Sequence, residues 1–173
     1  MKTHGVKRAI IDLGGNIYVF GKKKDGSLWN VGIKDPGDPG GNPALILHLA
    51  NATVVTSGVY ERFFMQDGIR YHHILDTKTG YPARTGLLSS TIVCESSIAA
   101  DALSTSVFVL GEEKGMALIN KIQDGQVAGE KFTEIPGLHA QVSAVFIAED
   151  GRITASKSLE GILKPAIGTA EFK

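Results

Sequence analysis

An aspartate and a threonine one helical turn apart are the residues of this sequence best suited to holding a cation. Asp101 and Thr105 lie in the segment Asp-Ala-Leu-Ser-Thr, which we expect on a helix. Positions i and i+4 share one helix face, so the carboxylate and the hydroxyl can converge on one point, with Ser104 beside it. Two oxygen ligands suit Mg²⁺, which usually keeps waters or substrate phosphates in its other positions. The alternative is that Asp101 only favours the helix dipole while the hydroxyls bond back to helix carbonyls.

Two adjacent histidines provide a candidate general base. His72 and His73 lie near the end of a predicted strand, 69–75, and a long polar loop follows them. Side chains alternate along a strand, so at most one imidazole can point into a given site. The other is expected at the surface, and a surface position is also the ordinary alternative for both.

Ser57 and Gly58 are candidate ligand contacts at the end of another predicted strand. Glycine allows a ligand to approach the backbone closely, and the Ser57 hydroxyl can bond to a phosphate or a ring system. The alternative is a tight connection between strands in which Glu61 and Arg62 pair on the surface.

The elements that must position these residues are read from turn residues and from hydrophobic periodicity. Residues 22–26 are expected as a hairpin turn, 35–43 as a surface loop, and 60–75 as a hairpin closed at 66–68. A helix capped by Ser96 or Ser97 should end at Gly111, and a second helix should cover 112–121. A short helix is expected near 156–163. The predicted strands are 8–13, 16–21, 27–33, 44–49, 52–56, 60–65, 69–75, 88–94, 142–148 and 152–155. The pattern predicts an α+β fold, with an antiparallel sheet and helices packed on one face.

Length and charge limit the class of protein. A chain of 173 residues with 43% hydrophobic content fits a single domain, 1–173. Its formal net charge of zero gives no global field that would attract nucleic acid or an anionic membrane. The only cysteine, Cys94, excludes an internal disulfide framework.

The order of several motifs resembles the ApbE family of FAD:protein FMN transferases. The matching segments are 11–16, 29–33, 56–62, 72–82 and 101–105. The resemblance implies a T-fold-like half of an ApbE-type architecture. It also implies Mg²⁺-dependent transfer of FMN from FAD to a threonine hydroxyl of a target flavoprotein, with release of AMP.

Site roles follow from the same resemblance. It places the catalytic role on His73 and the metal ligands on Asp101 and Thr105. The backbone around Ile74, together with Ser57 and Gly58, would lie against FAD. Relatives are often exported or membrane-anchored by an upstream leader, which this chain does not show.

Other functions with the same residues stay open. Water in place of the protein hydroxyl would make an FAD pyrophosphatase that yields FMN and AMP. Because members of the family are roughly twice this long, the chain is expected to correspond to the carboxy-terminal half and to have weak activity or none in isolation. A non-catalytic flavin-binding or assembly module is therefore a further alternative. Pairing with a complementary amino-terminal half, or dimerisation, is expected on the same ground.

Overall fold

A six-stranded antiparallel sheet forms the centre of the molecule. The computed structural model describes residues 2–38, 40–127 and 142–166. The strand order in the large sheet is β1-β2-β5-β8-β9-β10, and every neighbouring pair is antiparallel. Its strands are β1 (Ala9–Leu13), β2 (Asn16–Phe20), β5 (Ala52–Gly58), β8 (Leu87–Cys94), β9 (Ser143–Ala148) and β10 (Ile153–Ala155). This arrangement confirms the predicted α+β class.

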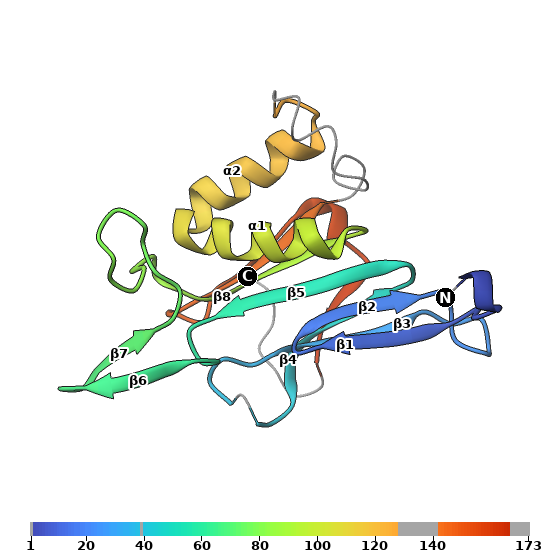
Figure 1. Ribbon diagram of the computed structural model, residues 1–173, viewed down its shortest axis with the longest axis horizontal. Helices are drawn as coiled ribbons and strands as arrows, with labels where there is room; N and C mark the ends of the chain where they lie inside the picture. The colour runs from blue at the N-terminus through green and yellow to red at the C-terminus, as the bar shows by residue number, and fades with distance from the viewer. Residues whose placement is uncertain (1, 39, 128–141, 167–173) are drawn as a thin grey trace.

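Two helices cover one face of this sheet (Figure 1). Helix α1 (Ser97–Leu110) begins at Ser96, whose hydroxyl accepts a hydrogen bond from the Ala99 amide, and ends at Gly111, as predicted. Helix α2 (Glu112–Gln123) follows at once. Their buried side chains pack with β5, β8 and β9 in one apolar cluster that contains Phe108, Ile92 and Phe146. No helix of the described residues is long and apolar enough to cross a bilayer.

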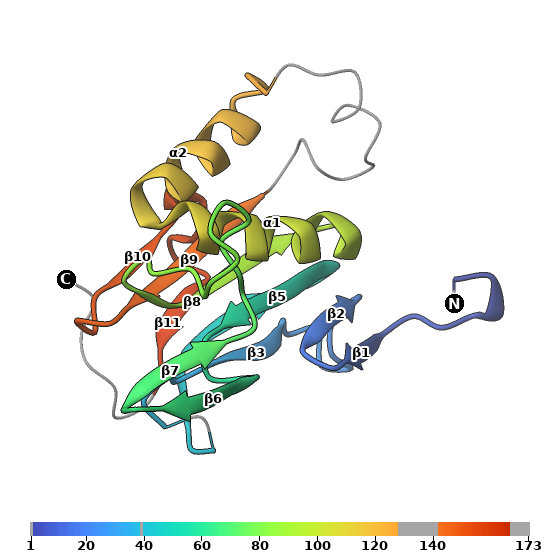
Figure 2. The same ribbon diagram turned by 60° about the vertical axis from the view of Figure 1, so that its left-hand side comes forward.

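A second, smaller sheet covers the opposite face (Figure 2). It contains β3 (Trp29–Lys34), β4 (Pro43–Leu49) and β11 (Leu163–Pro165), in the order β11-β4-β3. Its apolar side chains pack against the underside of the large sheet, with members of both sheets in one cluster. These include Val31, Ile33, Leu45, Leu47, Val19, Val54, Val93 and Val145. The core therefore has two layers, one on each side of the central sheet.

The turn at 22–26 does not close a hairpin, which corrects the prediction. Strand β2 pairs with β1 and β5, whereas β3 pairs with β4 in the other sheet. The Trp29 indole donates to the carbonyls of Phe20 and Gly21, at 3.3 and 3.0 Å, and this contact fixes the crossover between the sheets.

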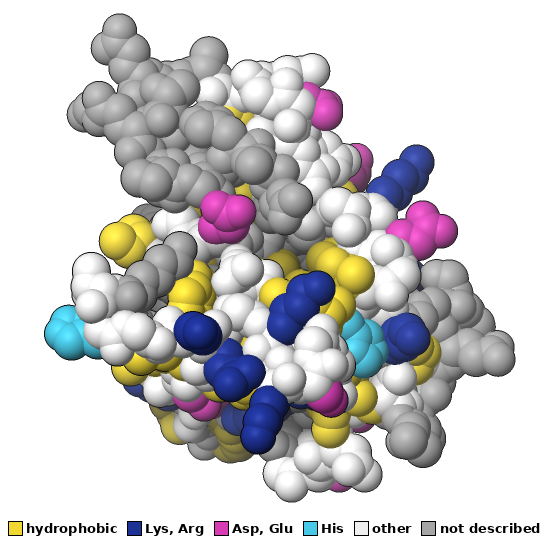
Figure 3. Space-filling view, turned by 90° about the vertical axis from the view of Figure 1, so that its right-hand side faces the viewer, with side chains coloured by type: hydrophobic (Ala, Val, Ile, Leu, Met, Phe, Trp, Pro, Cys, Tyr) yellow, Lys and Arg dark blue, Asp and Glu magenta, His cyan; other side chains and the backbone are white. Residues whose placement is uncertain are grey.

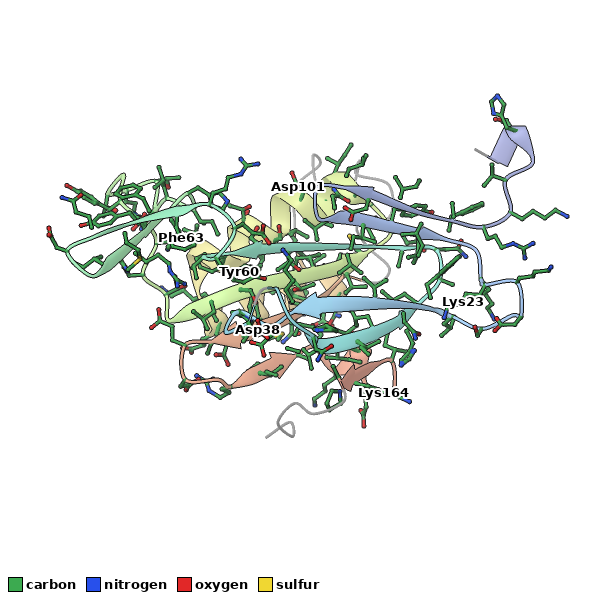
Figure 4. All side chains as sticks on the ribbon, turned by 90° about the horizontal axis from the view of Figure 1, so that it is seen from below. Lys23, Asp38, Tyr60, Phe63, Asp101 and Lys164 are labelled. Atoms are coloured by element: carbon green, nitrogen blue, oxygen red, sulfur yellow. The ribbon has the colours of Figure 1, made fainter. Side chains whose placement is uncertain are left out.

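Lys23 lies at the opposite end of the molecule from Phe63 (Figure 4). Figure 3 looks onto the right-hand side of Figure 1, where several Lys and Arg side chains stand at the surface.

Three other boundaries differ from expectation. The strand predicted at 60–65 begins only at Phe63, and the strand predicted at 69–75 ends at His72, so the hairpin consists of β6 (Phe63–Gln66) and β7 (Ile69–His72). The short helix predicted near 156–163 is a single 3-10 turn, Lys157–Leu159, because the chain then extends into β11 and pairs with β4. Ile98, in the first turn of α1, is 81% exposed although it is apolar.

Replacement of Phe108 by alanine should destabilise the fold strongly. The Phe108 side chain is fully buried between α1 and the sheet. Truncation of such a residue to alanine costs about 3–5 kcal/mol. Leu110, on the same helix but 42% exposed, is the matched control, and Leu110→Ala should cost less than about 1 kcal/mol. Chemical denaturation measures both losses, and equal losses would contradict the assigned core.

Candidate active site

Strand β5 and helix α1 bring three hydroxyl groups together. The Ser57 hydroxyl lies 2.9 Å from the Ser104 hydroxyl and 3.1 Å from the Thr105 hydroxyl. Ser104 is buried, whereas Asp101 and Thr105 are exposed on the same helix. The predicted pair of oxygens is therefore open to solvent and is supported from below by a strand.

The direction of the hydrogen bonds follows from the last acceptor in the series. The Ser104 hydroxyl donates to the Asp101 backbone carbonyl at 3.0 Å, and this bond uses its single proton. Ser104 must then accept from Ser57, so Ser57 must accept from Thr105. We call this series from Thr105 through Ser57 and Ser104 to the Asp101 carbonyl the hydroxyl chain. It holds the Thr105 proton inward and leaves the lone pairs of the Thr105 oxygen for a ligand.

The donors at this position fit a magnesium ion. Among the described residues Asp101 forms no ion pair with Lys or Arg, so its carboxylate is free to bind a cation. No group of three or more His, Cys, Asp and Glu side chains gathers anywhere in the described part of the chain. Two protein oxygens plus waters or phosphates are typical of Mg²⁺.

His73 is exposed and directly follows β7, the second strand of the hairpin. Its Nδ1 lies 3.2 Å from the Arg62 carbonyl oxygen, and its backbone amide donates to the same oxygen at 3.1 Å. Because a carbonyl only accepts, Nδ1 carries the proton in this contact, and Nε2 of the neutral ring presents a lone pair. This is the tautomer that a general base requires. In the described residues no contact joins His73 to Asp101 or Thr105.

His72 connects the end of the hairpin to helix α1 by a packing contact. The two imidazoles point to opposite faces, as predicted: His73 is exposed and His72 is buried. The His72 ring packs edge-on against Phe108, with ring centroids 5.8 Å apart. Phe108 follows Thr105 by three positions on α1, a rise of roughly 4.5 Å. The end of the hairpin is thus anchored about one turn away from the hydroxyl chain.

Ile74 and Gly58 are placed by packing within the protein. The Ile74 side chain lies in the core beneath α1, and its carbonyl accepts from the Ala83 amide at 3.0 Å. A Cβ at Gly58 would lie 2.7 Å from a ring carbon of Tyr60, so glycine is needed there for the tyrosine ring. Burial raises the pKa of Tyr60 to about 12. Contact of FAD with Ser57, Gly58 and Ile74 stays a prediction.

Sequence reasoning missed two of these residues. Tyr60, which covers Gly58, was treated only as the start of a strand. Ser104 was predicted only to flank the candidate metal ligands Asp101 and Thr105. The hydrogen bond between its buried hydroxyl and Ser57 was not predicted. Its position offered a signal, because Ser104 shares the buried stripe of α1 with Ala100, Leu103 and Val107. A hydroxyl on such a stripe needs a partner.

A pocket of about 470 Å³ lies away from this site. It is lined by residues at the beginning of β5 and the end of β8, among them Ala52, Val93 and Cys94, together with Ser143. Thr53 pairs with Cys94, whereas Gly58 pairs with Ser89 at the other end of the two strands. The pocket and the hydroxyl chain are therefore at opposite ends of β5, and the chemistry of the site does not use this pocket.

The fold and site define an α+β protein with a carboxylate and a supported hydroxyl on its first helix, and comparison with known proteins specifies the class. Residues 1–128 match the ApbE family, and the chain belongs to that family. An FAD:protein FMN transferase of Treponema pallidum is 42% identical over 167 residues, which cover 92% of this chain and 41% of the relative. One from Klebsiella pneumoniae is 40% identical over 126 residues, or 72% of this chain and 37% of the relative.

Solved structures agree with this assignment. The crystal structure of the ApbE protein from Thermotoga maritima is 33% identical, with a TM-score of 0.71, and the match covers 90% of this chain and 44% of that one. The apo form of the Pseudomonas stutzeri flavinyl transferase ApbE is 31% identical, with a TM-score of 0.67 and coverage of 93% and 45%. The chain thus spans less than half the length of these relatives.

Acid should destabilise the protein through His72. Burial, and then the nearby charges of Arg84, His73 and Arg70, lower the pKa of His72, while a backbone contact with Ala83 opposes this shift. Between that lowered pKa and the ordinary value of about 6.5, the unfolded chain binds a proton that the folded chain does not. Stability is therefore lost as the pH falls below about 6.5, with a slope of up to about 1.4 kcal/mol per pH unit.

The His72→Gln variant tests this linkage. It removes the titrating group, so its free energy of unfolding should depend less on pH between 5 and 7 than that of the parent. Denaturant titrations at a series of pH values give both slopes, and measurements at pH 8 correct for the different side chain. Parallel pH dependences of the two proteins would show that His72 is not the group responsible.

Proposed function

We propose that this chain takes part in the transfer of FMN from FAD to a threonine hydroxyl of a target flavoprotein. The observation that supports this most is the hydroxyl chain, which orients Thr105 beside the free carboxylate of Asp101 at the surface. A relative that is 42% identical carries the name FAD:protein FMN transferase.

Each of these residues would have a separate role in the reaction. The acceptor oxygen attacks the phosphorus of the FMN part, the bond from that phosphorus to the bridging oxygen of the pyrophosphate breaks, and AMP leaves with that oxygen. The Nε2 lone pair of His73 accepts the proton of the acceptor hydroxyl. Asp101 and Thr105 would hold Mg²⁺, with the hydroxyl chain keeping Thr105 in its rotamer. When bound, the ion supplies positive charge that stabilises the phosphate oxygens and the departing AMP.

The segment that bears His73 is separate from the helix that bears the candidate metal ligands. The proposed transfer requires the acceptor hydroxyl to lie beside Nε2 of His73 and in line with the phosphorus of the FMN part. Alignment of this kind is the main contribution that an enzyme makes to phosphoryl transfer. The ion would act on the phosphate oxygens of FAD, whereas His73 acts on the acceptor hydroxyl.

Thr105→Val and Ser106→Ala form a matched pair for testing the proposal. Both residues are exposed hydroxyls on α1, but the Ser106 hydroxyl only bonds back to the Ala102 carbonyl. We expect Asp101→Asn and Thr105→Val each to lower AMP release from FAD by at least about a hundredfold, and Ser106→Ala to leave it unchanged. The assay uses FAD, Mg²⁺ and a threonine-containing acceptor, and mass spectrometry detects the transferred flavin phosphate.

The products separate the possible activities. FMN attached to the acceptor supports transfer, whereas free FMN and AMP in equal amounts would indicate pyrophosphate hydrolysis. Flavin binding without AMP release, in the presence of acceptor and with the relatives' amino-terminal half added as a separate chain, would contradict catalysis and indicate a binding module. Equal activity of the Thr105→Val and Ser106→Ala variants would remove Thr105 from the site.

A further inference from the structure

The β6–β7 hairpin is a protruding two-stranded ribbon with an unusual number of exposed apolar side chains. It extends from the body of the molecule and is attached at one end (Figures 1 and 2). Phe63, Phe64, Met65 and Ile69 are all 45–60% exposed. Two strands without further support are marginally stable in water, and exposed apolar side chains on both faces of such a ribbon indicate an interaction site.

One face of the ribbon leads directly to His73. Strand register pairs Phe64 with Tyr71 and Gln66 with Ile69, and the His73 amide bonds to the Arg62 carbonyl in the same register. Alternation therefore places all six of these residues on one side, which we call the outer hairpin face: Arg62, Phe64, Gln66, Ile69, Tyr71 and His73. The Phe64 and Tyr71 rings stack on this face with centroids 5.1 Å apart. Met65, Phe63 and Arg70 lie on the other face.

The charge around this face is positive and uncompensated. On this face Arg62 forms no ion pair with any described residue, and Glu61 is bound to Lys34 at 2.9 Å. Arg70, on the other face, lies over the Phe63 ring. The only acidic residue within the ribbon is Asp67, at its tip. A partner that carries carboxylates is therefore favoured over one that carries lysines.

The free edge of the ribbon is on β6. The Arg84 guanidinium donates to the Arg70 carbonyl at 3.1 Å, which occupies part of the β7 edge. Among the described strands, β6 pairs only with β7. An extended segment can therefore add beside β6 through main-chain hydrogen bonds while its side chains contact the stacked rings.

We propose that the outer hairpin face is the docking surface for the acceptor protein, which binds there as an extended, apolar segment bearing carboxylates. This inference rests on the proposed function and names its partner surface. The segment would run beside β6 with a carboxylate against Arg62, and the acceptor threonine would then stand beside the Nε2 atom of His73. Docking of this kind explains why the aromatic rings, the free cation and the candidate base lie along one face.

Peptide binding tests the proposal without relying on catalysis. The probe is a synthetic seven-residue peptide in which a central threonine is flanked by alternating valines and aspartates, and its partner probe has lysines in place of the aspartates. We expect the acidic peptide to shift the backbone amide signals of β6, β7 and His73 in two-dimensional NMR spectra of the full chain. Phe64→Ala should weaken binding at least about tenfold, whereas Met65→Ala, on the other face, should not.

A charge-reversal variant distinguishes loss of a specific contact from unfolding of the ribbon. Arg62→Glu should lose the acidic peptide and gain the lysine peptide, and a merely misfolded variant would bind neither. Equal binding of both peptides by the parent, shifts confined to the Met65 face, or concentration-dependent shifts of the outer face without peptide would overturn the proposal; the last would mean that a second copy of the chain occupies it.

Failure of the docking surface and failure of the proposed function give different results. If transfer occurs but Phe64→Ala and the parent flavinylate the acidic peptide equally well, the surface is wrong and the function stands. If the acidic peptide binds the outer face but no flavin is transferred, the surface stands and the function is wrong.

Discussion

The hydrogen-bonded contact between Ser57 and the paired hydroxyls of α1 is the constraint on which the rest of the site depends. Ser57 comes from the end of β5, an interior strand of the large sheet, and Ser104 and Thr105 come from the helix that covers that sheet. Because the Ser104 hydroxyl donates its proton to the Asp101 carbonyl, the direction of every earlier hydrogen bond in the series is fixed as well. A surface threonine on an isolated helix would rotate or bond back to its own backbone. Here the strand holds it in a single orientation.

The rigid layers contrast with the part of the molecule that carries His73. Apolar clusters on both faces of the central sheet hold β5 and α1, and the oxygens inherit that rigidity. The β6–β7 ribbon instead meets the body through the edge contact of His72 with Phe108. The candidate metal ligands are therefore built on a fixed scaffold, whereas His73 is on a projecting arm. Such an arrangement suits the proposed transfer, in which the second substrate is a protein.

Local signals in the sequence predicted local features well. The cap at Ser96, the stop at Gly111 and the opposite faces of His72 and His73 each depend on a few neighbouring residues. The second sheet was not predicted, because the pairing of β3 with β4 and β11 rather than with β2 depends on distant strands. The hydroxyl chain also escaped prediction: it joins residues 47 and 48 positions apart, and only the packing of α1 on β5 determines which serine meets which. Sequence named Ser57, Asp101 and Thr105, and the structure supplies their relation.

The most direct test of this account is a crystal of the chain grown with FAD and Mn²⁺, examined for anomalous scattering from the metal. Mn²⁺ takes the same oxygen ligands as Mg²⁺ and is visible by this method. We predict one peak in coordination distance of an Asp101 carboxylate oxygen and the Thr105 hydroxyl, with the Ser57 hydroxyl still bonded to Thr105. A flavin-bound crystal with no metal at these two oxygens, or with the Thr105 hydroxyl turned toward its own helix, would contradict the account.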